Sequence, residues 1–497
     1  MAKKLLIIGG GGAGLSAGIY GQMNGYDTEI FEMHTIPGGV CTAWKRGDYI
    51  FDGCIHWLVG SKPGNDFHTI WKELGAIKEK KIYDHEQFVQ LHIGGKTVHF
   101  YTDIDRFEKH LLELAPEDER EIQRLAKSIR KLTRLEMAVL KPTALFTVAE
   151  WVRYGIKMFP FLGEMMRLLS TPMTDFARRF KNPTLRTAFS TIFPIDGFAL
   201  GFFAITMAWM HNKTAGVPEG GSLPFALNLK KRYESLGGTI HLGKKVAGIT
   251  VENGVAVGIE LSDGTTHRGD IVISAADGHS TLFNLLEGKY LTKKLKRYYA
   301  DPILFPATLQ ISLGIRRDLR ADPHTVARVL DQPIIIGGLP QPAVTVQNYS
   351  FDPSFAPAGK SVIVCYLFTD YDHWEKLYTA DRPAYEKEKV KAADDLIALL
   401  ERWYPGIGGE VEVRDVATPM TYVRYTANWR GAWEGWAPTV KTFKWKIPTE
   451  LPGLRNFHMI GQWTTPGGGL PPAAMQGRSL IQILCARDGK PFTTTEA

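Results

Sequence analysis

The feature that most constrains the fold is the glycine-rich loop GGGGAGLSAG, which follows an apolar run at residues 5–8. The dinucleotide fingerprint GxGxxG fits Gly9, Gly11 and Gly14. Its glycines permit a tight turn, a close approach of the backbone to a pyrophosphate, and close packing of the next helix on the strand. Residues 15–24 suit that helix, whose N-terminus would face the phosphates. The loop therefore predicts a strand–turn–helix unit that binds a dinucleotide.

The residues after this unit strengthen the prediction. The segment DTEIFE is typical of a second strand and ends at Glu32. Its spacing from Gly14 is the one at which an acidic side chain accepts hydrogen bonds from a ribose diol. A second glycine pair, Gly38 and Gly39, follows and lets the chain pass close to a bound cofactor. These residues predict a dinucleotide without distinguishing FAD from NAD.

Length and charge limit the classes of protein to consider. The chain has 497 residues, too many for one compact core, so two or more lobes are expected. Its formal net charge of +7 comes without a dense basic block, which argues against nucleic-acid binding. Only four cysteines occur, so a reducing cytosol is the expected compartment. The first apolar run is too short for a secretory signal, and no uninterrupted run of about 20 apolar residues predicts a membrane-spanning helix.

Four side chains that could ligate a metal lie between residues 31 and 57. They are His34, Cys41, Cys54 and His56. They lack a close CxxC pair, and the CIH segment is not a usual zinc-binding arrangement. If Glu32 binds a ribose, the four possible ligands lie one after another beside the dinucleotide rather than around one metal ion. We predict no metal site here, and of the four only His56 keeps a catalytic role.

Longer motifs are spread over nearly the whole chain. They are IIGGGGAGLSAG, FEMHTIPGG and FDGCIHWLVG at the start, VPEGGSLPFAL and DIVISAADG in the middle, and NFHMIGQWTTPGGGLPPAAMQG at the end. Together they resemble the phytoene desaturase, carotenoid isomerase and retinol saturase group of FAD-dependent oxidoreductases. Most desaturases and amine-oxidase relatives carry Arg directly after the second glycine pair, whereas Val40 and Cys41 follow it here. In this departure the chain resembles the retinol saturases of the group more than the desaturases.

The resemblance implies an α/β fold. A Rossmann-like split FAD-binding domain of the glutathione-reductase type would be accompanied by a substrate domain of mixed sheet plus helices. The expected FAD-binding segments are residues 1–81, 216–290 and 441–497. The substrate domain is expected at residues 82–215, largely helical, and at residues 291–440.

The resemblance also implies where FAD is held. In the middle segment, Ser222 can cap a helix, and a backbone group of Val246 would meet the adenine. In the last segment, Gly461 would pass the pyrophosphate or ribityl chain, and glycines 467–469 would open a helix beneath the isoalloxazine. The expected FAD contacts are Gly9, Gly11, Gly12, Ala13, Gly14, Glu32, Met33, Gly38, Gly39, Val40, Val246, Gly461, Gly468, Gly469 and Leu470.

The chemistry implied is hydride transfer between a substrate carbon and flavin N5, coupled to proton gain or loss on the neighbouring carbon. The enzyme would act as a saturase, a desaturase or an isomerase. The first candidate proton group is His56, since it follows the flavin segment and an ordinary imidazole titrates near neutral pH. A loop-structuring role is the alternative. Tyr422 and Arg424 are further candidates because alternation would place them on one face of a strand, with a plain ion pair or surface face as the alternative.

Two strongly apolar segments indicate the kind of substrate. Residues 187–210 either pack in a core or line a tunnel, and the resemblance favours the tunnel because a long hydrocarbon binds almost entirely through buried apolar area. Residues 150–169 carry aromatic, Met and basic side chains. They form either a helical hairpin around Pro160 or an interfacial helix that admits a lipid from the cytoplasmic membrane. The expected partner is thus a long apolar polyene or isoprenoid, with peripheral membrane contact left open.

Competing functions remain. One is an FAD amine oxidase or another lipid-directed flavoenzyme. Another is a non-enzymatic, prenyl-binding escort protein that has lost flavin, against which the intact glycine motifs and Glu32 argue. The sequence has no second GxGxxG motif after a strand that would indicate a stable NAD(P) site, so the electron partner stays open.

Overall fold

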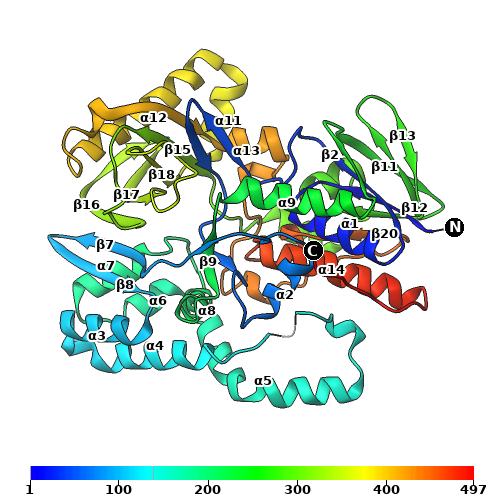
Figure 1. Cartoon of the computed structure of the whole chain (residues 1–497), viewed down its shortest axis with the longest axis horizontal. Coiled ribbons are helices and arrows are strands. Elements are labelled where there is room, and N and C mark those ends of the chain that lie inside the picture. Colours follow the sequence, from blue (N-terminus) through cyan, green and yellow to red (C-terminus); the bar gives the residue numbers. More distant parts are fainter. Residues whose placement is uncertain (1, 138) are drawn as a thin grey trace.

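The computed structural model describes residues 2–137 and 139–497. Its organising element is a five-stranded parallel sheet with the strand order β10-β2-β1-β14-β20 (Figure 1). The strands come from three distant parts of the chain: β1 (Lys4–Ile8), β2 (Asp27–Glu32), β10 (Thr239–Leu242), β14 (Ile271–Ser274) and β20 (Phe457–Met459). Strand β1 pairs with β2 and β14, and its residues 5–8 are buried, which explains its continuous apolar sequence.

Helices and a small antiparallel sheet complete this first unit. The helices α1 (Gly12–Met23), α9 (Ser222–Ser235) and α14 (Leu470–Arg487) pack on one another, with α1 in contact with both others. The other elements are α2 (Asp66–Glu73), α10 (Lys293–Ala300), and the sheet of β11 (Val246–Glu252), β12 (Val255–Leu261) and β13 (Thr266–Arg268). The α/β fold class with a Rossmann-like unit split over three parts of the chain is therefore confirmed.

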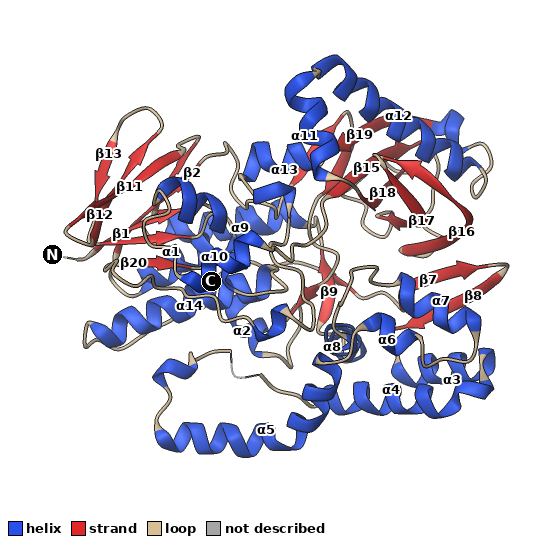
Figure 2. Ribbon diagram, turned by 180° about the vertical axis from the view of Figure 1, so that it is seen from behind, coloured by secondary structure: helices blue, strands red, loops and turns tan. Residues whose placement is uncertain are grey.

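The second unit is built on a seven-stranded mixed sheet with the order β19-β15-β18-β17-β16-β7-β8. Its strands are β7 (Gln87–Ile93), β8 (Lys96–Tyr101), β15 (Thr308–Ile315), β16 (Thr325–Ile336), β17 (Leu339–Asn348), β18 (Ser361–Phe368) and β19 (Val411–Ala417). The parallel pairing of β7 with β16 joins the early part of the chain to the late part. Figure 2 shows helices α11 (Tyr371–Ala380) and α12 (Arg382–Glu401) on one side of this sheet, while α13 (Pro419–Thr426) lies towards the first unit.

A helical layer lies below the seven-stranded sheet in Figures 1 and 2. It contains α3 (Ile104–Leu114), α4 (Glu119–Leu132), α6 (Met173–Ala177), α7 (Pro183–Thr191) and α8 (Leu200–His211). Helix α5 (Val148–Leu169) runs along the outer edge of this layer. Between the two units lie β5 (Leu58–Val59), β6 (Ile82–Tyr83) and β9 (Ala215–Pro218), together with the hairpin of β3 (Ala43–Arg46) and β4 (Tyr49–Asp52).

The predicted cap of α9 is wrong. The N-cap is Gly221, at a φ of +66°, and a Cβ atom there would overlap the carboxylate of Asp52. The hydroxyl of Ser222 instead donates to Oδ1 of Asp52 (2.6 Å), and the Ser222 amide donates to Oδ2 (2.7 Å). A side chain from the β3–β4 hairpin therefore caps this helix from outside its own segment.

Candidate functional site

The two glycine pairs of the amino-terminal segment lie side by side. The amide of Gly9 donates to the carbonyl of Phe31 (2.8 Å), which ties the loop to the end of β2. The amide of Gly38 donates to the carbonyl of Gly10 (2.8 Å), and Gly11 and Gly38 form a parallel bridge. A Cβ atom on Gly14 would overlap the carbonyl oxygen of Gly9, so only glycine permits this close packing.

Helix α1 begins without a side-chain cap. Its N-cap is Gly11, and no side chain accepts from its first amides among the described residues. A Cβ atom built on Gly11 meets only the carbonyl oxygen of Gly38, at 3.8 Å. Free amides, the positive end of the helix dipole and an open approach fit a pyrophosphate at this position.

The carboxylate of Glu32 lies at the end of β2 beside the loop. Its Oε2 accepts from the amide of Gly10 and its Oε1 from the amide of His34, both at 2.7 Å. Glu32 is 5% exposed, and burial raises the pKa of its carboxyl above the usual range although these hydrogen bonds oppose the shift. Each oxygen retains a further lone pair, so the group can also accept from a ribose hydroxyl.

The last segment meets the first at the helix N-termini. Gly461 has a φ of +99°, and a Cβ atom on it would lie 3.4 Å from the Cβ atom of Ala13. The side chain of Leu470, the first residue of α14, lies 3.2 Å from the position that a Cβ atom on Gly12 would take. Helix α14 begins after the glycines, as predicted. Because Pro471 and Pro472 carry no N–H, the backbone donors at its N-terminus are the amides of residues 469 and 470.

These features pass a test of fit for a dinucleotide. The glycines leave the backbone open where a phosphate would approach, an uncapped helix supplies donors, and a buried carboxylate retains acceptor capacity next to them. The glycine loop, Glu32, the second glycine pair, Gly461 and Leu470 thus lie together around the N-termini of α1 and α14. Val246 is buried in the first position of β11, and the segment before it is tied to the end of β2, because the amide of Lys244 donates to the carbonyl of Glu32 (2.8 Å).

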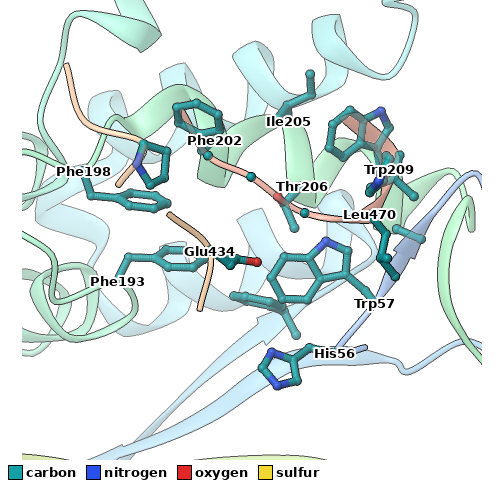
Figure 3. A pocket seen from close by; sticks show the side chains of 18 of the residues that line it. His56, Trp57, Phe193, Phe198, Phe202, Ile205, Thr206, Trp209, Glu434 and Leu470 are labelled. Carbon is teal, nitrogen blue, oxygen red and sulfur yellow. The ribbon is translucent and has the colours of Figure 1, made fainter. Parts of the chain in front are cut away.

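A cavity of about 900 Å³ extends from this region into the second unit. At one end it is lined by residues 464–472, the segment that opens α14, and elsewhere by apolar and aromatic side chains. Figure 3 shows Phe193, Phe198, Phe202 and Ile205 grouped around it. Residues 187–210 were expected either to pack in a core or to line a tunnel, and helix α8 does both. Its Phe202 and Ile205 line the cavity, while Phe203 and Met207 are buried in the core.

His56 lines the same cavity among aromatic rings. Its ring centroid lies 4.9 Å from that of Tyr366 and 5.9 Å from that of Trp433. Within residues 2–137 and 139–497, its Nε2 is buried and has no hydrogen-bond partner. Burial lowers the pKa of His56 to about 4, so the expectation of titration near neutral pH is wrong and the ring is uncharged at that pH.

The loop that carries His56 is held by Asp52. Its Oδ1 accepts from the amides of Cys54 (3.0 Å) and Ile55 (3.3 Å), besides its bonds to Ser222. The backbone carbonyl of Asp52 accepts from Nε2 of Gln310 (2.8 Å). Asp52 is fully buried and joins the hairpin, α9 and the seven-stranded sheet at one point.

The predicted placement of Tyr422 and Arg424 on one face of a strand is wrong. The segment is helix α13, in which residues two positions apart point to different sides. Tyr422 is buried and its hydroxyl donates to Oε1 of Gln310 (3.3 Å), behind the His56 loop. Arg424 is exposed, with its guanidinium 5.1 Å from the ring of Tyr425. Neither residue lines the cavity.

Glu434 is a cavity residue that sequence reasoning missed. Its side chain projects into the cavity between Phe193 and Trp57 in Figure 3. Burial raises the pKa of its carboxyl to about 7. The Glu434 loop adjoins the opening of α14, because the amide of Gly467 donates to the carbonyl of Trp436 (3.0 Å). The available signal was a single acidic residue within the tryptophan-rich segment AWEGW.

Helix α5 continues through Pro160, so the hairpin alternative is wrong. Its outer face carries a stripe of exposed apolar side chains, with Ile156 70% and Phe159 77% exposed. Its inner face contributes Met165 and Leu169 to the cavity lining. Among the described residues, no helix is both long enough and apolar enough to cross a membrane.

Comparisons with known proteins agree with this geometry. The sequence model of a family described as flavin containing amine oxidoreductase matches residues 13–480. Prolycopene isomerase from Daucus carota is 24% identical, with 97% of this chain and 79% of that protein covered. A lycopene-forming phytoene desaturase from Paracoccus sp. is 23% identical, with 97% of both covered. The crystal structure of an oxidoreductase from Methanosarcina mazei shares the fold, with a TM-score of 0.60, 19% identity, and 96% of this chain and 100% of that one covered.

Proposed function

The chain belongs to the flavin-containing amine oxidoreductase family and uses FAD, and from that premise we propose that it acts on the C–C or C=C bonds of a long apolar polyene or isoprenoid. The reaction is saturation, desaturation or cis–trans isomerisation. The relatives named as prolycopene isomerase and phytoene desaturase support this proposal over an amine oxidase.

One observation carries the proposal: the cavity that begins at the N-terminus of α14 has a volume of about 900 Å³, is lined mostly by apolar and aromatic side chains, and has few charged ones. Its lining suits a hydrocarbon, whose affinity comes from buried apolar area. When bound, FAD supplies hydride exchange at N5 with a substrate carbon. The expected FAD contacts are the residues gathered around the N-termini of α1 and α14, with Val246 at the adenine.

Within the cavity, Glu434 is the group that handles the proton. A carboxyl with a pKa of about 7 is divided between its two forms at neutral pH, so it can give or take a proton at the neighbouring carbon. His56 remains uncharged and orients the substrate through its ring and its unshared Nε2. The aromatic walls exclude water from the reacting bond.

Helix α5 makes the membrane contact. Its exposed apolar stripe includes Val152, Ile156 and Phe159, and exposed Arg153 and Lys157 lie on the same helix. Apolar side chains with basic neighbours favour the interface of an anionic bilayer. Because α5 also contributes Met165 and Leu169 to the cavity, a lipid leaving the bilayer can enter beneath it.

The proposal is tested by extracting the lipid that co-purifies with the protein and identifying it by mass spectrometry. A conjugated or branched isoprenoid, present in proportion to the protein and absent from preparations of a cavity-blocking Ile205→Trp variant, supports the proposal. Extracts from the wild-type protein that contain no isoprenoid, while added carotenoids and retinoids fail to bind, contradict it.

A further inference from the structure

One end of the cavity differs from the rest. It is lined by polar side chains from the strands of the seven-stranded sheet and the segments next to them: His85, Gln87, Thr102, His324, Thr325, Thr345 and Gln347. These residues lie together because β16 pairs with β17, which places Thr325 opposite Gln347, and because β7 lies on the other side of β16.

Two histidines are the centre of this polar end. The rings of His85 and His324 stack at 3.9 Å with an interplanar angle of 3°. Nδ1 of His324 lies 2.9 Å from the hydroxyl oxygen of Thr325, and the hydroxyl of Thr102 donates to the carbonyl of His85 (3.0 Å). Over the described ranges 2–137 and 139–497, Nε2 of His85 is buried and has no hydrogen-bond partner.

Two hydroxyls on other parts of the wall are already satisfied, whereas Nε2 of His56 and Nε1 of Trp433 have no partner among the described residues. The hydroxyl of Thr191 donates to the carbonyl of Thr187 (2.8 Å) within α7. The hydroxyl of Thr464 donates to the carbonyl of Gly461 (2.8 Å). A hydrocarbon can lie against these hydroxyls without loss, whereas covering His85 with a hydrocarbon leaves a buried polar atom unpaired.

Resting on the proposed function, we propose that the substrate carries an uncharged oxygen function, a hydroxyl or a carbonyl, at one end, and that His85 and His324 bind this end by hydrogen bonds. The substrate class is therefore an oxygen-terminated isoprenoid rather than a pure hydrocarbon. The apolar chain extends from this end past His56 and Glu434 towards Phe193 and Phe198.

The charges at this end favour an uncharged terminus over a carboxylate. Burial lowers the pKa of His85 to about 4 and that of His324 well below its usual value, so neither ring is a cation at neutral pH. The carboxylate of Asp84 also lines the cavity next to His85, and Lys62 is already paired with it. A carboxylate placed here would lack a cation of its own and would be repelled by Asp84.

The test is a binding measurement that does not require turnover. Phytanol, phytanic acid and phytane share one saturated branched carbon skeleton and differ only at the terminus. Each is delivered to the holoenzyme from cyclodextrin, and binding is followed by the change in fluorescence of the tryptophans, of which Trp57, Trp209 and Trp433 line the cavity. The variant His85→Phe keeps a ring for stacking on His324 but loses the polar atom, and Phe193→Leu alters the apolar end as a matched control.

We expect the wild-type protein to bind phytanol about tenfold more tightly than phytane or phytanic acid, which corresponds to one buried hydrogen bond to an otherwise unpaired group. His85→Phe removes the preference for phytanol over phytane, and Phe193→Leu weakens all three ligands alike. Equal binding of phytanol and phytane, tighter binding of phytanic acid, or a preference unchanged in His85→Phe overturns the inference and leaves the proposed function intact. Failure of all three to bind overturns both.

Discussion

The amide of Ser222 donates a hydrogen bond of 2.7 Å to Oδ2 of Asp52, a residue 170 positions earlier in the chain. The same carboxylate orders the turn that leads to His56. One fully buried side chain thus fixes both the start of α9, which packs on helix α1, and part of the cavity wall.

Replacing Asp52 with Ala should destabilise the protein by about 1–3 kcal/mol or more, because at least two buried amides lose their acceptor. Thermal unfolding followed by circular dichroism measures this. Ser222→Ala is the matched control, since it removes one hydroxyl and leaves the Ser222 amide bonded to Asp52, and its melting temperature should fall less. Equal losses in the two variants would show that the carboxylate does not hold the helix.

Gly14→Ala should abolish FAD binding or reduce it severely. The new methyl group would overlap the carbonyl oxygen of Gly9 and displace the loop from α1. The ratio of flavin absorbance to protein absorbance in the purified protein measures the loss. Gly155→Ala is the control, because Gly155 lies in α5 with nothing within 4 Å of an added Cβ atom, and its FAD content should equal that of the wild type. Normal FAD content in Gly14→Ala would refute the assignment of the loop.

Glu434 should give the reaction a pH dependence with a midpoint near pH 7. If the enzyme saturates a double bond, Glu434 is the proton donor and the rate falls above this pH. If it desaturates, Glu434 is the acceptor and the rate rises. In either case Glu434→Gln should remove this pH dependence of the rate and slow the reaction by about 10²–10⁴-fold. A pH dependence near pH 7 that persists in Glu434→Gln would assign the proton to another group.

The same group should affect stability. Burial raises the folded-state pKa of Glu434, so the folded protein keeps a proton that the unfolded chain has already released. Its contribution to stability therefore declines as pH rises from about the unfolded value, near 4.3, to about 7, and is constant above that. The difference in melting temperature between wild type and Glu434→Gln should change over that window. A difference that is independent of pH would contradict the raised pKa.

Replacing Ile156 and Phe159 with Ser should weaken binding to anionic vesicles by about 100-fold or more, because each side chain contributes about 1.5–3 kcal/mol when buried in the interface. Co-sedimentation with vesicles of mixed phosphatidylglycerol and phosphatidylcholine measures this. Both residues are mostly exposed, so the melting temperature should change little. Ile335→Ser changes an exposed apolar residue outside α5 and should leave vesicle binding unchanged. Comparable loss in that control would exclude α5 as the contact.

The parts of the site that could be predicted depend on short-range relations. Gly9, Gly14 and Glu32 lie within one strand–helix–strand unit, so their placement side by side follows from spacing alone. The helix α13 also had a local signal that was missed: Thr418 caps it and Pro419 occupies its first turn, which outweighs an apparent alternation at Tyr422 and Arg424.

The remaining features depend on contacts between distant segments. Asp52 replaces Ser222 as the cap of α9 only because the β3–β4 hairpin packs there. The pKa of His56 falls and that of Glu434 rises because both side chains are buried in a cavity assembled from both units. Sequence spacing carries no information about that burial.

The most direct test of the central claim is an anaerobic single turnover. Holoenzyme, oxidised or pre-reduced, is mixed with carotenoid and retinoid candidates or with primary amines, while the flavin spectrum is recorded and the products are separated by chromatography with mass detection. The account predicts that a polyene or isoprenoid gains or loses one double bond in proportion to the enzyme, or changes its cis–trans geometry with reduced flavin, and that amines leave the flavin unchanged. Bleaching of the oxidised flavin by amines, with every polyene recovered unaltered, would contradict it.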